Sequence, residues 1–315
     1  MKKLLVLALA LMSAAAAAQT FPSKTVRFVS GVTPGSASDT MARILADKLQ
    51  QKWGQSVIVE NRLGAGGLVG AKYVAQSEPD GTTIMMYASA FTVSTLLSPE
   101  VLNPKDMQAV AMVATIPTIL VSSPEKGYKK VQDLVAAAKA QPGKLVCSDA
   151  GIGSATHMNF ERFRFSAGIE VVNVHTKGVS EALTEVISGR ADCYFALVFQ
   201  AKKMVDGGRV VALATGSPRR SSLMPDVPTT LELGYPNSDY NFWVGALVPS
   251  RTPRAVVDKL HADITALVES PEVSGQIRKL GCDPAPMSVS DFEALIAREL
   301  EENAALIKKA NIKAE

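Results

Sequence analysis

Three stretches of the chain combine glycine, small residues and hydroxyl side chains directly before a predicted helix. They are VTPGSASD at residues 32–39, AGIGSATH at 150–157 and HTKGVSEA at 175–182. The first amides of a helix have no partner within the helix, and the helix dipole makes that end positive. Glycine lets the backbone approach a ligand closely, and Ser or Thr adds neutral donors. We therefore expect an anion to bind at these turns, with Lys177 able to add a charge-assisted contact.

Each turn taken alone also fits an ordinary helix cap, because capping and anion binding use the same residue types. Three similar turns in one chain favour the anion site. In open α/β sheets, ligands bind beyond the carboxyl ends of the strands, and all three turns lie at such ends.

The elements that carry these turns alternate between strand and helix. TVRFVS, SVIVE and TTIMMYAS are separated by helical patterns that begin near residues 37 and 67, and a second alternating set runs from VQDLVAAAKA to VVALATGS. Three further helical patterns begin near Pro253, Pro271 and Ser288. Alternation of this kind is typical of parallel βαβ units, and one sheet with this many strands would be awkward. The pattern predicts two α/β lobes that face each other.

The helix after the first turn has the clearest pattern. Ser36 and Asp39 fit a capping box, and Gly54 is a natural C-terminal stop. Its apolar positions recur on one face: Met41, Leu45, Leu49 and Trp53.

The N-terminus has the three regions of a secretory signal peptide. Lys2 and Lys3 precede an apolar run at residues 4–12, and alanines follow up to Gln19. We expect residues 1–18 to be removed by cleavage after Ala18, and the mature chain to be exported. The apolar run is too short to span a bilayer.

Composition narrows the function further. The chain has 33 Lys and Arg against 30 Asp and Glu, and aromatic residues make up 6%, so neither a basic stripe nor stacking platforms for nucleic acid are present. Three cysteines are too few for a disulfide scaffold. For Cys147, Cys193 and Cys282 we expect buried free thiols, with a bridge between Cys147 and Cys193 as the alternative.

Motifs of other chemistries are absent from the sequence. It has no H-E-x-x-H, no G-x-S-x-G and no G-x-x-x-x-G-K-[ST], and only three histidines. GAGGLVG at residues 64–70 resembles a dinucleotide fingerprint, but such a motif alone is weak evidence, and an exported protein meets little free nucleotide. We expect no cofactor and no metal.

Several segments of the chain resemble those of a known protein family. The segments that carry the resemblance are VENRLGAGGLVGAKYVAQSEPDG, GIGSATHM, TKGVSEALTEVISGRADCYF, MPDVPTTLELGY and LVPSRTPRAVVDKL, together with the first turn. They are similar to the Bug-type substrate-binding receptors of tripartite tricarboxylate transporters, over essentially the whole mature chain. The resemblance implies a two-lobed periplasmic-binding-protein fold that closes over a small carboxylate and passes it to a membrane partner.

Carried over by position, the resemblance implies a set of ligand-binding residues. Asp39 matches the family's acid at the helix start, and we interpret it as a structural cap, since an acid would repel an anion. The implied ligand-binding positions are Thr33, Pro34, Gly35 and Ser36 in the first turn, Ser89 and Ala90 after the third strand, and Ser154, His157, Lys177, Gly178 and Ala196 in the second lobe.

Three positions depart from the family pattern. Gly35–Ser36 stands where two glycines are common, Thr176 where an aromatic residue is frequent, and Ala196 where an acid is frequent. An acid would meet the ammonium group of an amino acid, so its loss favours a ligand without an amine, unless another acid takes over.

The resulting prediction is a monomeric periplasmic receptor for a small organic carboxylate. Lobe 1 should comprise residues 19–122 and 247–315, and lobe 2 residues 123–246. One alternative is an exported enzyme on the same scaffold, with Ser154 and His157 as the nucleophile and base. The other is a sensor that presents the ligand to a signalling partner.

Overall fold

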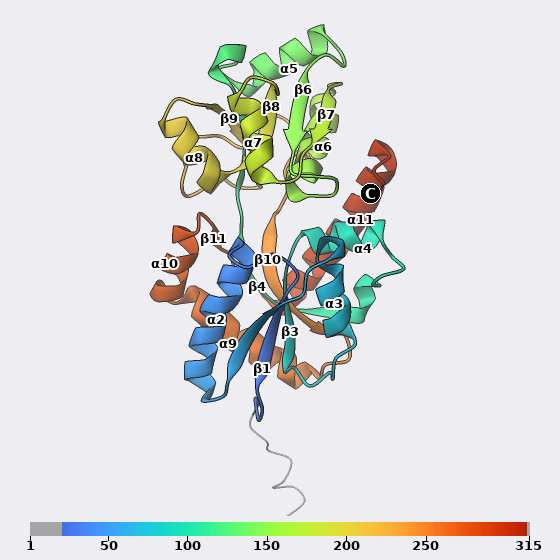
Figure 1. Cartoon of the computed structure of the whole chain (residues 1–315), viewed down its shortest axis with the longest axis vertical. Coiled ribbons are helices and arrows are strands. Elements are labelled where there is room, and N and C mark those ends of the chain that lie inside the picture. The colour runs from blue at the N-terminus through green and yellow to red at the C-terminus, as the bar shows by residue number, and fades with distance from the viewer. Residues whose placement is uncertain (1–20, 314–315) are drawn as a thin grey trace, which may run out of the picture.

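The computed structural model describes residues 21–313, so the predicted signal peptide lies outside the described residues. Within that range, no helix combines the length and apolar character needed to cross a membrane. The chain forms two sheets, one above the other along the long axis of the molecule, with helices around each (Figure 1). The two-lobed α/β fold predicted from the sequence is confirmed.

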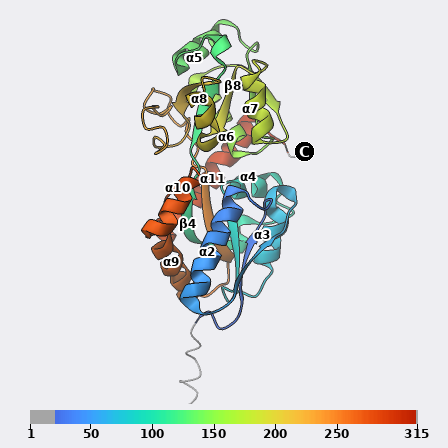
Figure 2. The same cartoon turned by 60° about the vertical axis from the view of Figure 1, so that its left-hand side comes forward.

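The first sheet has six strands in the order β11-β4-β10-β3-β1-β2. Helices α2, α9 and α10 cover one face and helices α3, α4 and α11 the other (Figures 1 and 2). The strands are β1 (Val26–Ser30), β2 (Val57–Asn61), β3 (Thr83–Ala88), β4 (Met107–Thr115), β10 (Trp243–Pro249) and β11 (Asp283–Pro284). The helices are α2 (Ala37–Trp53), α3 (Leu68–Ala75), α4 (Ala90–Leu97), α9 (Arg254–Glu269), α10 (Pro271–Lys279) and α11 (Val289–Ala310).

The second sheet has five strands in the order β7-β6-β8-β5-β9. Helices α5 and α6 pack on one face and helices α7 and α8 on the other. The strands are β5 (Thr118–Ser122), β6 (Val146–Asp149), β7 (Val172–His175), β8 (Cys193–Leu197) and β9 (Val211–Thr215). The helices are α5 (Val131–Ala140), α6 (Ala155–Ala167), α7 (Val179–Ile187) and α8 (Val198–Asp206).

Each sheet contains one central strand that is antiparallel to both of its neighbours. β10 is antiparallel to β3 and β4, and β5 is antiparallel to β8 and β9. Both are the first strands that the chain forms after it passes from one sheet to the other. The passages occur between β4 and β5 and between β9 and β10, and they lie together, since the Ile116 amide donates to the Phe242 carbonyl at 2.7 Å. The strand assignment therefore differs from the predicted boundaries at residues 122 and 246, because β5 belongs to the second sheet and β10 already begins at Trp243.

Cys147 and Cys193 form a disulfide, so the expectation of free thiols is wrong for this pair. The two residues are direct partners in the pairing of the parallel strands β6 and β8, with their Cα atoms 4.6 Å apart. The sequence does not reveal that β8, and not only β7, lies beside β6. Cys282 is a buried free thiol, as expected.

Helix α11 links the two lobes in addition to the two passages. It packs beside α4 on one face of the first sheet and ends beside α6 of the second lobe (Figure 1). Arg162 of α6 donates to Glu302 and to Asn303 of α11, both at 3.0 Å. Asn303 in turn donates to Thr92 of α4 at 2.9 Å. A polar network thus joins both lobes around α11.

Glu299 of α11 is a buried acid beside this network, and its titration predicts a pH dependence. It accepts a hydrogen bond from Trp243 Nε1 at 2.9 Å, and burial raises its pKa to about 8. Because the folded-state pKa lies above the unfolded value of 4.5, the folded chain holds the extra proton between these values. Stability should therefore fall as pH rises from about 4.5 to about 8, by up to about 1.4 kcal/mol per pH unit.

Glu299→Gln keeps an acceptor for Trp243 and removes this titration. Urea unfolding at pH 5, 6.5 and 8 should show the variant gaining stability relative to the unmodified chain as pH rises. A difference in stability that is constant across the three pH values would contradict the assignment. Glu293→Gln, an exposed substitution on the same helix, is the matched control.

Candidate functional site

The turn after β1 is exposed, and hydrogen bonds to the buried side chain of Asp39 hold its backbone in place. Thr33, Pro34 and Gly35 are exposed, whereas the side chain of Asp39 is fully buried. Its carboxylate accepts hydrogen bonds from the Gly35 amide at 2.9 Å and from Asn61 Nδ2 at 2.7 Å. In an ideal capping box this acid would bond the amide of Ser36, so the contact with Gly35 extends the support one residue further into the turn.

Arg43 neutralises the buried charge of Asp39. Its Nε and one of its terminal nitrogens donate to the two carboxylate oxygens, at 2.9 and 3.1 Å. Burial by itself would raise the pKa of Asp39, but the hydrogen bonds from Arg43, Gly35 and Asn61 outweigh it and lower that pKa. The acid is therefore paired and turned away from the exposed side of the turn.

Several turn amides that we expected to face an anion are bonded within the protein. The Gly35 amide is taken by Asp39, the Gly153 amide donates to His157 Nδ1 at 3.0 Å, and the Lys177 amide donates to Glu181 at 3.0 Å. Asp39, His157 and Glu181 can accept these hydrogen bonds because each lies about one helical turn further along the chain than the amide that it bonds. These three amides are therefore not free to bind an anion.

The backbone amides without a partner belong to the first two residues of each helix. At an N-terminus the first helical amides have no carbonyl to bond, and the caps of α2 and α6 reach only the third position, at Asp39 and His157. The amides of the first two positions have no partner among the described residues: Ala37 and Ser38 in α2, and Ala155 and Thr156 in α6. These amides, with the positive helix ends, are the candidate anion donors.

The remaining predicted residues differ in accessibility. Ser89 is buried at the start of α4, where its Oγ has no hydrogen-bond partner among the described residues, and Ala90 is half-buried. Lys177 is exposed and forms no ion pair within residues 21–313, and Gly178 is half-buried at the start of α7. Ala196 is 0% exposed within the core of the second lobe, so the side chain at this position offers no surface to a ligand.

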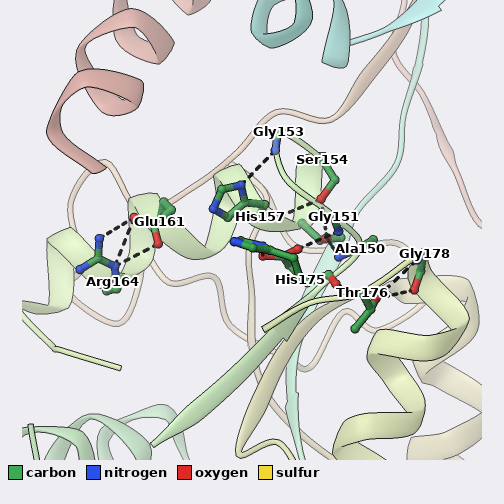
Figure 3. A network of polar contacts seen from close by, with 12 residues as sticks. Ala150, Gly151, Gly153, Ser154, His157, Glu161, Arg164, His175, Thr176 and Gly178 are labelled. Carbon is green, nitrogen blue, oxygen red and sulfur yellow. Dashed lines mark hydrogen bonds and ion pairs between the residues drawn. The ribbon is translucent and has the colours of Figure 1, made fainter. Parts of the chain in front are cut away.

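The two turns of the second lobe lie side by side (Figure 3), and residues of both form hydrogen bonds with Asp149. The Thr176 amide donates to the Asp149 carbonyl at 3.0 Å, and His175 Nδ1 lies 2.8 Å from Asp149 Oδ2. His157 packs edge-to-face on His175, with ring centroids 4.8 Å apart. Ser154, His157, Thr176 and Gly178 therefore form one cluster around Asp149 (Figure 3).

This cluster touches the first lobe at α4. A Cβ atom added to Gly153 would lie 3.2 Å from Leu97 and 3.3 Å from Val93. A Cβ atom here would crowd both side chains, and residues with a side chain rarely adopt the φ of +74° at Gly153, so glycine suits this approach between the lobes. The turn of the second lobe is thus held against the helix that starts at Ser89.

Asp149, His175 and Asn61 are parts of the site that sequence reasoning missed. Each is the last residue of a strand, and Asp149 and His175 are direct partners in the pairing of β6 with β7. The sequence does place a polar residue at the end of each of these two strands, and this pattern could have indicated the site. Their adjacency depends on the strand order, which the sequence does not state.

Asp149, His157 and His175 place one possible metal-ligand atom each within 4.8 Å of one another. The hydrogen bonds argue against a metal at this position. His157 Nδ1 accepts from the Gly153 amide, so the neutral ring carries its proton on Nε2 and has no free lone pair there. A metal-binding histidine instead donates from its second nitrogen.

The glycines of the GAGGLVG stretch serve packing. A Cβ atom on Gly67 would lie 2.6 Å from the Tyr87 ring, and one on Gly31 would lie 2.7 Å from the Cα of Gly67. The Tyr87 hydroxyl donates to the Gly66 carbonyl at 2.7 Å. The stretch therefore fits against β3 and the end of β1, and this contact accounts for the glycines without a dinucleotide.

Comparison with known proteins agrees with this arrangement. The family model described as "Tripartite tricarboxylate transporter family receptor" matches residues 41–312. Protein BugT of Bordetella pertussis is 29% identical over 305 residues, covering 96% of this chain and 94% of BugT.

Two solved structures from Rhodopseudomonas palustris also align over most of the chain. Rpa4515 with adipate has a TM-score of 0.78 and 26% identity, covering 93% of this chain and 99% of that one. MatC with bound malate has a TM-score of 0.74 and 25% identity, covering 91% and 100%. Both of these structures hold a bound carboxylate, and the matched family model describes a transporter receptor. The chain itself belongs to the tripartite tricarboxylate transporter family of receptors, as a Bug-type member.

Proposed function

We propose that this receptor captures a small organic carboxylate between its lobes and delivers it to the membrane subunits of a tripartite tricarboxylate transporter. Signal-peptide cleavage near Ala18 would release it into the periplasm as a monomer. Lobe closure around the ligand would be the signal that the membrane partner reads, as expected for hinged two-lobed proteins.

The observation that carries the proposal is the set of unpaired amides at the N-termini of α2 and α6. They follow the carboxyl ends of β1 and β6, one in each lobe. Because the caps leave the first two amides of each helix free, each lobe can bind a carboxylate oxygen without a formal positive charge. The carboxylates bound to Rpa4515 and MatC support the same ligand class.

The geometry does not favour the enzyme alternative. Ser154 Oγ accepts from the backbone amide of His157 at 3.2 Å, and the Nδ1 atom of the His157 ring is engaged by Gly153. A nucleophilic serine would instead donate to a ring nitrogen of its base. Ser154 therefore acts as a helix cap.

A thermal-shift screen tests the proposal. Dicarboxylates, tricarboxylates, aromatic acids and amino acids are added at concentrations well above an expected micromolar dissociation constant. A ligand at 100 times its dissociation constant should raise the melting temperature by roughly 5 °C or more. We expect at least one carboxylate to do so and to be recovered unaltered. A shift produced only by neutral or cationic solutes would contradict the proposal.

A further inference from the structure

Exposed apolar side chains gather at one edge of each sheet. Six large apolar residues are exposed within residues 21–313, and five of them lie at two places, with Ile58, Leu63 and Val69 in the first lobe and Val172 and Val174 in the second. The first place is β2 and the start of α3, and the second is β7, so each is at the last strand of its sheet. Leu231, the sixth residue, lies near the opposite edge, where Thr229 pairs with Thr215 of β9.

The two edge strands β2 and β7 lie on the same side of the molecule. At the opposite edges, the hydroxyl of Ser222, which follows β9, donates to Asp283 of β11 and joins the two lobes there. The strand orders place β2 and β7 at the ends of the sheets away from this contact. Figure 1 shows β7 and α3, the helix after β2, on the same side of the two lobes. Since each lobe supplies one of these edges, lobe closure changes the spacing between them.

Helix α3 leaves the outer surface of the first lobe uncovered. Its buried side packs against β1 and β3, in the cluster that contains Leu68, Val29 and Met85. Val69 therefore faces outward and is 46% exposed, and Ile58 of β2 lies beyond the helix and is 41% exposed. The edge of this lobe thus presents apolar surface that no part of residues 21–313 covers.

The charged groups beside this apolar surface leave it net positive. Glu60 pairs with both Arg27 at 3.1 Å and Arg62 at 2.6 Å. Arg62 also lies over the Tyr73 ring, 3.5 Å from its centroid, and its Nε has no hydrogen-bond partner among the described residues. Lys72 is exposed and forms no ion pair within residues 21–313. Three cations thus surround one acid, and arginine and tyrosine are both common at the centres of binding surfaces.

Strand β2 also offers backbone groups to a partner. The Arg62 amide donates to the Ser30 carbonyl of β1 at 2.9 Å. Because the residues that bond one neighbour alternate along a strand, Ile58 and Glu60 also direct their backbone groups to β1, and Val59 directs its amide and carbonyl to the open edge. No strand of the described residues pairs there, since β2 ends the sheet. Such an edge accepts an extended segment of another chain.

We propose that this edge docks the membrane subunits of the transporter, through an extended segment on their periplasmic side that carries apolar and acidic side chains. The apolar residues cover Ile58, Leu63 and Val69, and the acids pair with Arg62 and Lys72. Val172 and Val174 form the second contact, so the partner touches both lobes and senses their closure. This inference rests on the proposed function and names the surface that serves delivery.

A second copy of the receptor does not match this surface. In a symmetric dimer the same patch lies on both sides of the interface, so the cations of one copy would face those of the other. Like charges that face each other oppose association by several kcal/mol. The net positive charge therefore favours a different, acid-bearing partner.

Site-specific photocross-linking in the source cells tests the docking surface. A benzophenone amino acid replaces Leu63, Val69 or Val174 in turn, and Leu231 in the control. We expect the first three positions to form adducts with a membrane subunit of the transporter, identified by mass spectrometry, and Leu231 to form none. Adducts only with lipid or with a second copy of the receptor, equal adducts at Leu231, or no adduct at all would overturn the inference.

Uptake measurements separate docking from ligand binding. The Val69→Asp, Lys72→Glu double variant reverses the charge of the surface, and Leu231→Asp is the matched control. The double variant should bind the acid found in the thermal screen within twofold of the unmodified chain, but uptake of that acid by cells that carry only this variant should fall at least about tenfold. Leu231→Asp should change neither, and melting curves verify that both variants are folded.

Unchanged uptake by the double variant, or an equal loss of ligand affinity, would contradict the docking surface. The two proposals can fail separately. If the unmodified receptor binds no acid, the carboxylate function fails, whereas the cross-linking result still decides the docking surface.

Discussion

Asp39→Ala should reduce carboxylate affinity by about 10- to 100-fold, or about 1.4–2.8 kcal/mol. The buried carboxylate is the acceptor for the Gly35 amide and for Asn61, and it pairs with Arg43. Without it, the exposed turn loses its support, and the α2 amides are no longer presented in a fixed geometry. Isothermal titration with the acid found in the thermal screen measures the loss.

Asp47→Ala is the matched control for Asp39→Ala. Asp47 lies on the same helix but is exposed, with surface partners Gln51 and Lys48. Its removal should change affinity and stability by less than about 0.5 kcal/mol. If Asp39→Ala bound the acid as tightly as Asp47→Ala does, the ordered turn would not be needed for binding.

Removal of the disulfide by a Cys147→Ser, Cys193→Ser double substitution should destabilise the protein by about 4 kcal/mol. This value follows from the chain entropy of closing a loop across a sequence separation of 46 residues. The bond joins β6 to β8 two residues before Asp149, at the strand end that carries the second-lobe turns. Urea unfolding of the double variant measures the effect.

Cys282→Ser provides the comparison for the double substitution. Cys282 is a buried free thiol in the first lobe, so this change tests the cost of a buried hydroxyl without the loss of a cross-link. The double variant should lose clearly more stability than Cys282→Ser. A loss below about 1 kcal/mol in the double variant would show that the cross-link contributes little.

The sequence predicted those features of the fold that depend on local patterns. The first helix begins at Ala37 after the Ser36 cap and ends at Gly54, which adopts a φ of +64°. The three C-terminal helices begin at Arg254, Pro271 and Val289, close to the predicted positions. Capping and helical periodicity act over a few residues, so one sequence is enough to read them.

Features that depend on strand order were not predictable in this way. The disulfide required β6 to lie beside β8, and the antiparallel placement of β5 and β10 followed from passage between the lobes. The same limit applied to Asp149 and His175, which are 26 residues apart and meet only through the pairing of β6 with β7.

The sequence predicted the turns of the candidate site, but it did not predict their hydrogen bonds. The turns at Ser36 and Ser154 do precede the helices α2 and α6. The amides of Gly35, Gly153 and Lys177 are nevertheless bonded internally, because Asp39, His157 and Glu181 reach back to them. A sequence shows which residues can donate, but not which donors the chain has already satisfied.

The central claim is that this receptor binds a small organic carboxylate. Its most direct test is native mass spectrometry of the receptor purified from its source cells. Gentle ionisation retains a tightly bound ligand, and its release gives the mass and the charge class of the solute. We predict a small organic acid at one equivalent per chain, replaceable by the acid that raises the melting temperature most. A neutral or cationic solute that no carboxylate can displace would contradict the account.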